Sequence, residues 1–256
     1  MAKHTQQTLK QGIPASALSE LARLAVSEPL RSGPDRETFI WEAPGGVSRI
    51  VKRYDSRRWR EALRERLAGQ DPRSPGRREY ETLLELEQAG VSVPRPIACH
   101  EEGALSLVVM ELLEPLVSLR DRLQQNPELA AQSFEPVLEL VQRFHGAGWY
   151  HRDLYLDHLV LVGEPERLAL IDLERARRDR HPRRRWFIKD LAALLVSTPD
   201  EVEPRLCLRF LSRWLDHHGV QGRRIRRRWL HAVQAKARRM AAHVPHGGTS
   251  YPPKQS

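Results

Sequence analysis

The chain has 256 residues, 40% of them hydrophobic and 29% charged, which is enough to bury a substantial core in one or two lobes. No apolar run reaches the roughly 18 residues of a membrane-spanning helix, and no basic start leads into an apolar signal core, so we expect a cytoplasmic protein. Cys99 and Cys207 lie far apart without Cys-x-x-Cys spacing, which disfavours disulfide and zinc sites. The formal net charge of +9 favours an anionic partner.

The first part of the chain predicts a helix followed by strands. Residues 14–27 favour a leading helix, and residues 37–42 and 47–54 have the pattern of strands on either side of a turn at 43–46. Lys52 stands late in the second strand, directly after two apolar residues. A lysine in that place is typical of kinases, where it binds the ATP phosphates and pairs with a glutamate from a nearby helix.

The glutamate that would pair with Lys52 is predicted in a helix over residues 78–86, whose apolar positions mark one side. We choose Glu79, with Glu81 and Glu85 as the rival choices. Lys52 and Glu79 taken singly would be ordinary surface charges. A nucleotide-binding pair is favoured because Lys52 and Glu79 precede the two acids Asp153 and Asp172, described below, in the order found in kinases.

Two further segments of the first part have less definite patterns. Residues 31–36 lack the G-x-G-x-x-G spacing of a phosphate-covering loop, so that loop stays unassigned. Residues 57–67 form a basic amphipathic pattern with Trp59, Leu63 and Leu67 on one face. Such a helix could lie on an anionic membrane surface, although packing against the protein core explains the same stripe.

Residues 105–113 are an apolar run that predicts a strand, and it ends where a hinge between two lobes should fall. The adenine ring of ATP would bond backbone atoms near Glu111 and Leu113, with Met110 behind it. A core strand that binds nothing fits the same residues.

The most informative segment is residues 149–158, which contain the triplet His151-Arg152-Asp153. A short apolar run that follows ends at Asp172, nineteen positions after Asp153. Phosphoryl transfer from ATP needs one carboxylate near the attacking hydroxyl and a second on Mg²⁺. The sequence therefore predicts Asp153 as the catalytic aspartate, with His151 and Arg152 beside it in the catalytic loop, and Asp172 as a metal ligand.

The surroundings of this loop agree with a kinase. Apolar residues recur at helical spacing over 134–145, and glycines end that helix just before the loop. Downstream, the runs 159–162 and 168–171 are separated by residues 163–167, which predicts a hairpin with both acids at the mouth of one small sheet. A His-Arg-Asp triplet alone is a common surface sequence, so this order of helix, loop, hairpin and acid is what favours kinase chemistry.

One position departs from the usual kinase pattern. Where kinases have an asparagine as the second metal ligand, this chain has His158. Mg²⁺ prefers oxygen ligands, whereas imidazole suits Zn, Cu, Fe or Ni. His158 is therefore either an unusual metal ligand or a brace for Asp153 or Asp172.

Arginine is concentrated in two places, with seven arginines in residues 175–185 and five in residues 223–228. Nucleic acid is one candidate partner, but neither a helix-turn-helix pattern nor an aromatic platform accompanies the arginines, and a solvated basic face explains the same residues. The first run follows Asp172, where a kinase has its acceptor segment, and we predict that it binds an acceptor with carboxylates or phosphates. Its members are Arg175, Arg177, Arg178, Arg180, Arg183, Arg184 and Arg185.

With these segments placed, the chain resembles the lipopolysaccharide core heptose kinases of Gram-negative bacteria, of the WaaP type, a branch of the protein-kinase-like fold. The resemblance is carried by residues 150–158, 171–176 and 185–194. It implies ATP-dependent phosphorylation of an inner-core sugar at the cytoplasmic face of the inner membrane. It also implies that His158 is a family trait and that Asp190 is the buried aspartate that supports the catalytic loop.

These inferences together predict an α+β, bilobal protein-kinase-like fold with a small β-rich N-lobe and a larger helical C-lobe. We expect a helical extension over residues 1–30, the N-lobe over 31–113, the C-lobe over 114–245 and a flexible tail over 246–256. The expected ligands are ATP, Mg²⁺ and an anionic glycolipid acceptor, the lipopolysaccharide inner core, with peripheral attachment to the inner membrane and no nucleic acid. The alternatives are a kinase for another sugar, such as Kdo, and a catalytically inactive scaffold at the membrane.

Overall fold

The computed structural model describes residues 13–43, 45–55, 73–114, 116–179 and 183–242. The basic amphipathic segment 57–67, for which membrane binding and core packing were both open, lies outside the described residues, as do Arg180 and the tail 246–256. Within the described ranges, no helix combines the length and the apolar character needed to cross a membrane.

The chain divides into two compact units. Unit 1 contains the residues up to Glu85 together with Pro94–Leu112, and unit 2 contains Leu86–Val93 together with the residues from Leu113 onward. The segment 86–93 lies inside the expected N-lobe but belongs to unit 2, and the leading helix, expected as a separate extension, belongs to unit 1.

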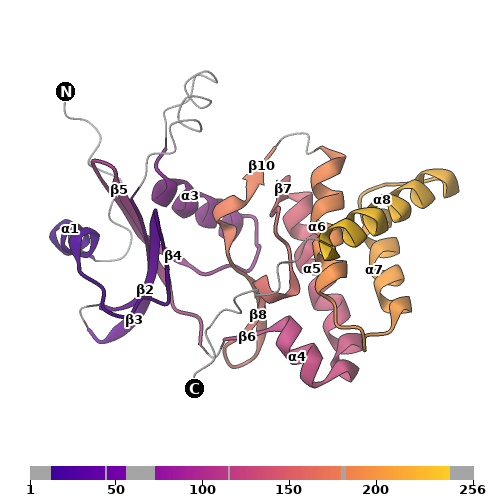
Figure 1. Ribbon diagram of the computed structural model, residues 1–256, viewed down its shortest axis with the longest axis horizontal. Coiled ribbons are helices and arrows are strands. Elements are labelled where there is room, and N and C mark those ends of the chain that lie inside the picture. The colour runs from indigo at the N-terminus through magenta and orange to yellow at the C-terminus, as the bar shows by residue number, and fades with distance from the viewer. Residues whose placement is uncertain (1–12, 44, 56–72, 115, 180–182, 243–256) are drawn as a thin grey trace. The chain divides into compact units, whose positions relative to one another are not determined.

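Unit 1 is built on a five-stranded antiparallel sheet with the strand order β1-β2-β3-β5-β4 (Figure 1). Its strands are β1 (Arg31–Gly33), β2 (Arg36–Ala43), β3 (Val47–Asp55), β4 (Pro96–Glu102) and β5 (Leu105–Glu111). The predicted strands and the turn between β2 and β3 are confirmed. Residues 31–36, for which the sequence predicted no strand, contain β1 and a two-residue turn, because Gly33 pairs with Arg36.

The two faces of this sheet are covered by different helices, α1 (Ala15–Arg23) and α3 (Pro75–Gln88). Because successive side chains of a strand point to opposite faces, Phe39 and Val51 pack with α1 in one apolar core, whereas Lys52 and Tyr54 contact α3. Figure 1 shows the sheet between these helices.

The start of α3 is fixed by a close approach to β5. A Cβ atom on Gly76 would lie 3.0 Å from backbone atoms of Leu107, so only glycine fits there without a shift. The N–H of Gly76 donates to Oγ of Ser106 at 3.1 Å, which satisfies a backbone donor of the first helical turn. This contact sets the position of Glu79 one turn later.

Unit 2 contains a small sheet with the order β6-β8-β9, the strand pair β7 and β10, and helices (Figure 1). The strands are β6 (Leu116–Ser118), β7 (Trp149–Tyr150), β8 (Leu159–Val162), β9 (Arg167–Leu170) and β10 (Arg177–Arg178). The helices are α4 (Leu119–Gln125), α5 (Ala130–Gly146), α6 (Arg184–Ser197), α7 (Pro204–His217) and α8 (Arg223–Ala241), with the short 3-10 helices η1 (Pro127–Leu129), η2 (Leu156–His158) and η3 (Leu173–Arg175). The predicted hairpin is confirmed as β8 and β9, and the predicted helix before the catalytic loop as α5.

Helix α5 leads into the loop through Gly148, where a side chain would not fit. Gly148 has φ 84°, and a Cβ atom there would lie 2.9 Å from the carbonyl oxygen of Asp179. That close contact lets β7 pair with β10, where Tyr150 lies opposite Arg177. The catalytic loop begins directly after β7.

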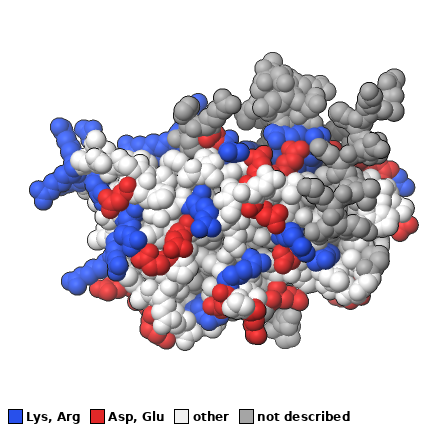
Figure 2. Space-filling model, turned by 180° about the vertical axis from the view of Figure 1, so that it is seen from behind, with Lys and Arg blue, Asp and Glu red and all other residues white. Residues whose placement is uncertain are grey.

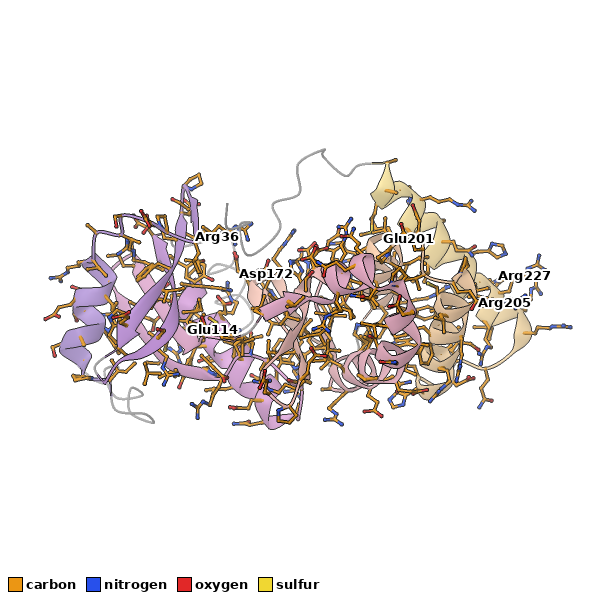
Figure 3. The ribbon with its side chains drawn as sticks, turned by 90° about the horizontal axis from the view of Figure 1, so that it is seen from below. Arg36, Glu114, Asp172, Glu201, Arg205 and Arg227 are labelled. Carbon is orange, nitrogen blue, oxygen red and sulfur yellow. The ribbon has the colours of Figure 1, made fainter. Side chains whose placement is uncertain are left out.

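The two arginine-rich runs lie in different parts of unit 2. In Figure 3, Asp172 lies at one end of the unit, and Arg205 of α7 and Arg227 of α8 project from the opposite end. Figure 2 shows Lys and Arg side chains gathered at the end formed by α7 and α8. Arg227 of the second run thus projects from the end opposite Asp172, whereas Arg184 of the first run lies over the ring of Trp229, which directly follows the second run.

Candidate active site

In unit 1, β3 and α3 bring Lys52 and Glu79 together. Nζ of Lys52 donates to Oε1 of Glu79 at 2.6 Å, and the hydroxyl of Tyr54 donates to the other carboxylate oxygen. Glu79 is only 3% exposed, so these donors compensate the cost of burying its charge. Of the glutamates weighed from the sequence, Glu79 is the one that contacts Lys52, while Glu81 pairs with Arg77.

The face that carries Lys52 also presents apolar side chains. Ile50 precedes Lys52 by two residues, pairs with Ile40 on β2 and pairs with Met110 on β5. Ile50 and Met110 are buried, but Ile40 is 46% exposed and could contact a flat ring. The sequence analysis named Met110 but missed both isoleucines, which the alternation along β2 and β3 could have identified.

The predicted adenine-binding backbone lies where the chain passes from unit 1 to unit 2. Glu111 ends β5, and its N–H donates to a carbonyl oxygen of the same unit at 2.9 Å. Leu113 is buried in a core cluster of unit 2 with Val160 and Ala169. Glu111 and Leu113 thus stand on the two sides of the unit boundary.

In unit 2, the catalytic loop is held by the carboxylate of Asp190 on α6. Oδ2 accepts from the backbone N–H of His151 and Oδ1 from that of Arg152, each at 2.7 Å. Asp190 is 0% exposed, and a buried carboxylate is stable only when such donors satisfy it. The contacts fit the supporting role that the family resemblance implied for Asp190.

The Asp190 carboxylate has a further donor in His145 of α5. Nε2 of His145 lies 3.3 Å from Oδ2 of Asp190, and Nδ1 lies 3.0 Å from the indole nitrogen of Trp214 on α7. Because the indole N–H can only donate, Nδ1 accepts and Nε2 carries the proton toward Asp190. Three helices therefore meet at the carboxylate that positions the loop.

His151 and Arg152 act on the shape of the loop. Nε2 of the neutral His151 donates to the carbonyl oxygen of Ile171 at 3.0 Å, and Nδ1 accepts from the N–H of Asp153 at 3.3 Å. Burial lowers the pKa of His151, which keeps this arrangement neutral. Arg152 adopts φ 77°, a left-handed backbone that is rare outside glycine, and its guanidinium lies over the ring of Trp186. His151 is fully buried, and its ring joins the loop at Asp153 to the backbone of Ile171 next to Asp172.

Asp153, the predicted catalytic residue, has a cation at each carboxylate oxygen. Nζ of Lys189 lies 3.2 Å from Oδ1, and Nη1 of Arg175 lies 2.8 Å from Oδ2. The Asp153 side chain is 21% exposed, so it is accessible from solvent. Arg175 was among the predicted acceptor-binding arginines, but Lys189 was missed, although it directly precedes Asp190.

His158 links the predicted catalytic and metal-binding acids. Its Nδ1 lies 2.7 Å from the carbonyl oxygen of Asp153 and must donate to it, and its Nε2 lies 3.5 Å from Oδ2 of Asp172. Asp172 also has a left-handed backbone, with φ 57°. His158 can therefore support the loop and bind a metal at the same time, because Nδ1 bonds the backbone of Asp153 and Nε2 faces the carboxylate of Asp172.

The other predicted acceptor arginines have varied surroundings. Arg177 donates to backbone carbonyls of its own segment, and Arg178 donates to the carbonyl oxygen of Ala147 at 3.3 Å. Arg183, Arg184 and Arg185 are exposed. Of these three, the guanidinium of Arg184 lies over the ring of Trp229 and that of Arg185 over the ring of Trp186.

Comparison with known proteins identifies the family. Residues 26–212 match the lipopolysaccharide kinase (Kdo/WaaP) family. The chain belongs to this family. The resemblance found in the sequence motifs is thereby confirmed.

Individual members of the Kdo/WaaP family are similar over much of their length. The lipopolysaccharide core heptose(I) kinase WaaP of Pseudomonas aeruginosa is 34% identical over 174 residues, which cover 60% of this chain and 64% of that protein. The Escherichia coli K12 protein of the same name is 29% identical over 199 residues, covering 71% of this chain and 74% of that protein. The chain thus spans less than two thirds of the first relative and about three quarters of the second.

A solved structure, described as WaaP in complex with acyl carrier protein, gives a TM-score of 0.64 at 28% identity, covering 86% of this chain and 91% of that one. The predicted α+β, protein-kinase-like fold, with an antiparallel sheet in one part and helices in the other, is therefore confirmed. The family to which the chain belongs is described as one of lipopolysaccharide kinases.

Proposed function

We propose that this Kdo/WaaP-family chain is an ATP-dependent kinase that phosphorylates a hydroxyl of heptose in the inner core of lipopolysaccharide. The observation that carries the proposal is the catalytic loop, whose backbone is held by Asp190 so that Asp153 remains partly exposed. The names of the relatives, lipopolysaccharide core heptose(I) kinase WaaP, supply the substrate class.

The chemical step that we propose assigns one role to each of the predicted kinase elements. Lys52, held by Glu79, binds the ATP phosphates, Ile40 contacts the adenine, and backbone atoms at Glu111 and Leu113 bond its edge. Asp153 orients the acceptor hydroxyl and takes its proton. The hydroxyl oxygen bonds to the γ-phosphorus while the bond from that phosphorus to the β,γ-bridging oxygen breaks, and ADP leaves with the electron pair.

Mg²⁺ would be held by Asp172 and His158 together with phosphate oxygens of ATP. Among the described residues, no group of three or more His, Cys, Asp and Glu side chains is placed to hold a metal ion, and phosphate and water oxygens would supply the remaining ligands. In the neutral form of His158, the bond that Nδ1 donates leaves the lone pair on Nε2, and this atom and Oδ2 of Asp172, 3.5 Å apart, fit as ligands of one cation. When bound, the metal neutralises charge on the phosphates.

Because imidazole suits softer metals than Mg²⁺, His158→Asn should raise activity with Mg²⁺ relative to Mn²⁺. An unchanged Mg²⁺-to-Mn²⁺ ratio would leave His158 as a brace only.

The acceptor would be an anionic glycolipid, met by peripheral association with the inner membrane. The exposed arginines near the catalytic loop support this, because guanidinium groups pair bidentately with phosphates and carboxylates. The positive net charge of the chain supports attraction to an anionic surface.

The alternative acceptor is Kdo, whose kinases share the family. An inactive scaffold is disfavoured, because the chain keeps Lys52, Glu79, Asp153 and Asp172 and the contacts of a catalytic loop. The deciding experiment incubates the purified protein with ATP and with core oligosaccharide that lacks heptose phosphate. Mass spectrometry of the product should find one added phosphate on heptose. Phosphate on Kdo instead would select the alternative.

The matched negative control is Asp153→Asn, which keeps the shape of the side chain but removes the base. Transfer should fall by roughly 10²–10⁴-fold while ATP still binds, because the carboxylate acts on the nucleophile. Turnover near that of the parent protein would exclude Asp153 as the catalytic group.

We also propose that the chain binds acyl carrier protein, as the solved relative does. Unit 2 supports this with an apolar cavity of about 110 Å³, lined among others by Leu123, Phe134, Leu194 and Cys207. An alkyl chain is the kind of group that such a cavity would accept. Co-purification with acylated but not unacylated carrier protein is expected. Equal capture of both forms would show that the cavity takes no part.

A further inference from the structure

The two oxygens of the Asp153 carboxylate have partners that differ in how firmly they are held. Lys189, at Oδ1, has a side chain that is 22% exposed and stands on the long helix α6 next to the buried Asp190. Arg175, at Oδ2, has a side chain that is 55% exposed and ends the three-residue helix η3. Lys189 is thus an anchored partner, whereas Arg175 reaches Asp153 from the solvent side.

An exposed ion pair of this kind is easily exchanged. Such pairs contribute roughly 0–1 kcal/mol, because water and salt screen the charges and the side chains lose freedom. A guanidinium binds phosphate or carboxylate through parallel hydrogen bonds, so an anionic group on an incoming ligand can replace Asp153 as its partner. A neutral sugar or a water molecule offers no such replacement.

We propose that Arg175 is a specificity-determining residue that covers Oδ2 of Asp153 until an anionic group of the acceptor draws it away. Only an acceptor with a phosphate or carboxylate near its hydroxyl then uncovers the oxygen that receives the hydroxyl proton. Lys189 holds Oδ1 throughout, so the carboxylate keeps its orientation while Oδ2 changes partner. This inference rests on the proposed kinase function and adds the means by which the site selects the charge of its acceptor.

The same contact restrains the wasteful reaction with water. In that reaction a water oxygen bonds to the γ-phosphorus as the bond to the β,γ-bridging oxygen breaks, giving ADP and inorganic phosphate, and the water proton passes to Asp153. While Arg175 occupies Oδ2, a water molecule competes with a cation for that oxygen. ATP hydrolysis without acceptor is therefore suppressed.

The test compares the parent protein with Arg175→Ala, Arg175→Lys and the control Arg213→Ala. Arg213 is an arginine of similar exposure, 46% against 55% for Arg175, and it pairs with Glu135 on α5 at 2.6 Å, so Arg213→Ala removes the same charge away from the loop. Two rates are measured, namely ATP hydrolysis without acceptor and phosphate transfer to soluble core oligosaccharide. For Arg175→Ala, hydrolysis should rise roughly fivefold, the factor equivalent to about 1 kcal/mol, and the KM of the anionic acceptor should rise at least as much. Arg175→Lys should lie between, and Arg213→Ala should match the parent.

Each outcome separates the selection by Arg175 from the proposed function. Transfer by the parent protein tests the kinase activity, and the ratio of hydrolysis between Arg175→Ala and the parent tests the covering contact. Adding Asp153→Asn to Arg175→Ala should abolish the extra hydrolysis, since the uncovered oxygen is then gone. If Arg175→Ala leaves both hydrolysis and acceptor KM unchanged while the parent protein transfers phosphate, the covering role of Arg175 is overturned and the kinase assignment stands.

Discussion

The indole N–H of Trp214 donates to Nδ1 of His145, a residue 69 positions earlier in the chain, and this contact decides which nitrogen of His145 faces Asp190. Both residues are almost fully buried. Contacts that run from α7 through α5 to α6 therefore position the loop that carries Asp153. Apart from the arginines at the start of α6, these three helices contain no predicted acceptor-binding or nucleotide-binding residue.

Removing this support should cost stability as well as activity. Asp190→Asn leaves one acceptor oxygen where the carboxylate has two, so a buried backbone N–H of the loop loses its partner. We expect a loss of about 2–4 kcal/mol in the free energy of unfolding, measured by urea denaturation. Trp214→Phe, which keeps the ring but removes the N–H, should cost less, about 1–2 kcal/mol. Equal urea midpoints for Asp190→Asn and the parent would contradict the supporting role.

Local patterns predicted much of the fold. Helix α5 has apolar residues at helical spacing, and β8 and β9 are apolar runs separated by turn residues, so the sequence predicted all three elements. Strand β1 was missed because three residues carry too little pattern. Its partner β2 had the length to be recognised.

Contacts between distant segments account for what the sequence could not predict at the site. Lys189 reaches Asp153 across 36 positions, and the pairing of His145 with Asp190 spans 45. Tyr54 was missed although it follows Lys52 at the strand period of two residues, because a tyrosine on that face suits a core as well as a polar contact. The order of the motifs identified Asp153 as the catalytic acid. Its cationic partners could not be identified in this way, because their contacts depend on how η3 and α6 fold around the loop.

The Lys52–Glu79 pair should matter for ATP more than for the fold. Lys52→Met should weaken ATP binding by about tenfold or more, because a phosphate contact and the fixed geometry of the pair are both lost. The measurement is isothermal titration with a non-hydrolysable ATP analogue. Lys236→Met on α8 removes the same charge from a remote helix and should leave the affinity unchanged. If both variants bind the analogue like the parent, the nucleotide contacts other residues.

Lys189 should act through the orientation of Asp153. In Lys189→Met one oxygen of Asp153 loses its anchored partner, so kcat should fall by about tenfold, in line with a hydrogen bond to a charged group. The KM for ATP should stay within a factor of about two, since no nucleotide contact is assigned to this lysine. Lys189→Arg should restore part of the rate. A change confined to ATP KM would place Lys189 on the nucleotide instead.

Acid should destabilise the fold through His218. Its Nδ1 donates to the carbonyl oxygen of Trp214 at 2.9 Å, and its buried Nε2 has no hydrogen-bond partner among the described residues. Burial lowers the pKa of His218 from 6.5 to about 4. The unfolded chain therefore binds a proton more readily, and the contribution of His218 to stability is complete above pH 6.5 and is lost as the pH falls toward about 4.

His218→Gln should lose less stability than the parent protein between pH 7.5 and pH 5, when urea midpoints are compared at each pH. The control is His231→Gln, an exposed position on α8 that should follow the parent curve. Parallel curves for His218→Gln and the parent would show that the neutral form of His218 is not required.

The exposed arginines at the start of α6 should contribute to the acceptor site as a group. Arg183, Arg184 and Arg185 are each exposed, so single substitutions should have effects within roughly 1 kcal/mol, whereas the triple change to Ala should raise the acceptor KM by about tenfold or more. The matched control is the triple change of Arg223, Arg224 and Arg227 to Ala on α8, which removes the same charge from another helix, where Arg227 projects from the end of unit 2 opposite Asp172 (Figure 3). Steady-state kinetics with soluble core oligosaccharide, varying each substrate in turn, should show the KM for ATP unchanged in both variants.

Raised salt should weaken acceptor binding in the parent and in the α8 variant but much less in the α6 variant, because screening acts on charges that the α6 variant no longer has. If the two triple variants respond alike, the arginines of α6 act only through the net charge of the protein.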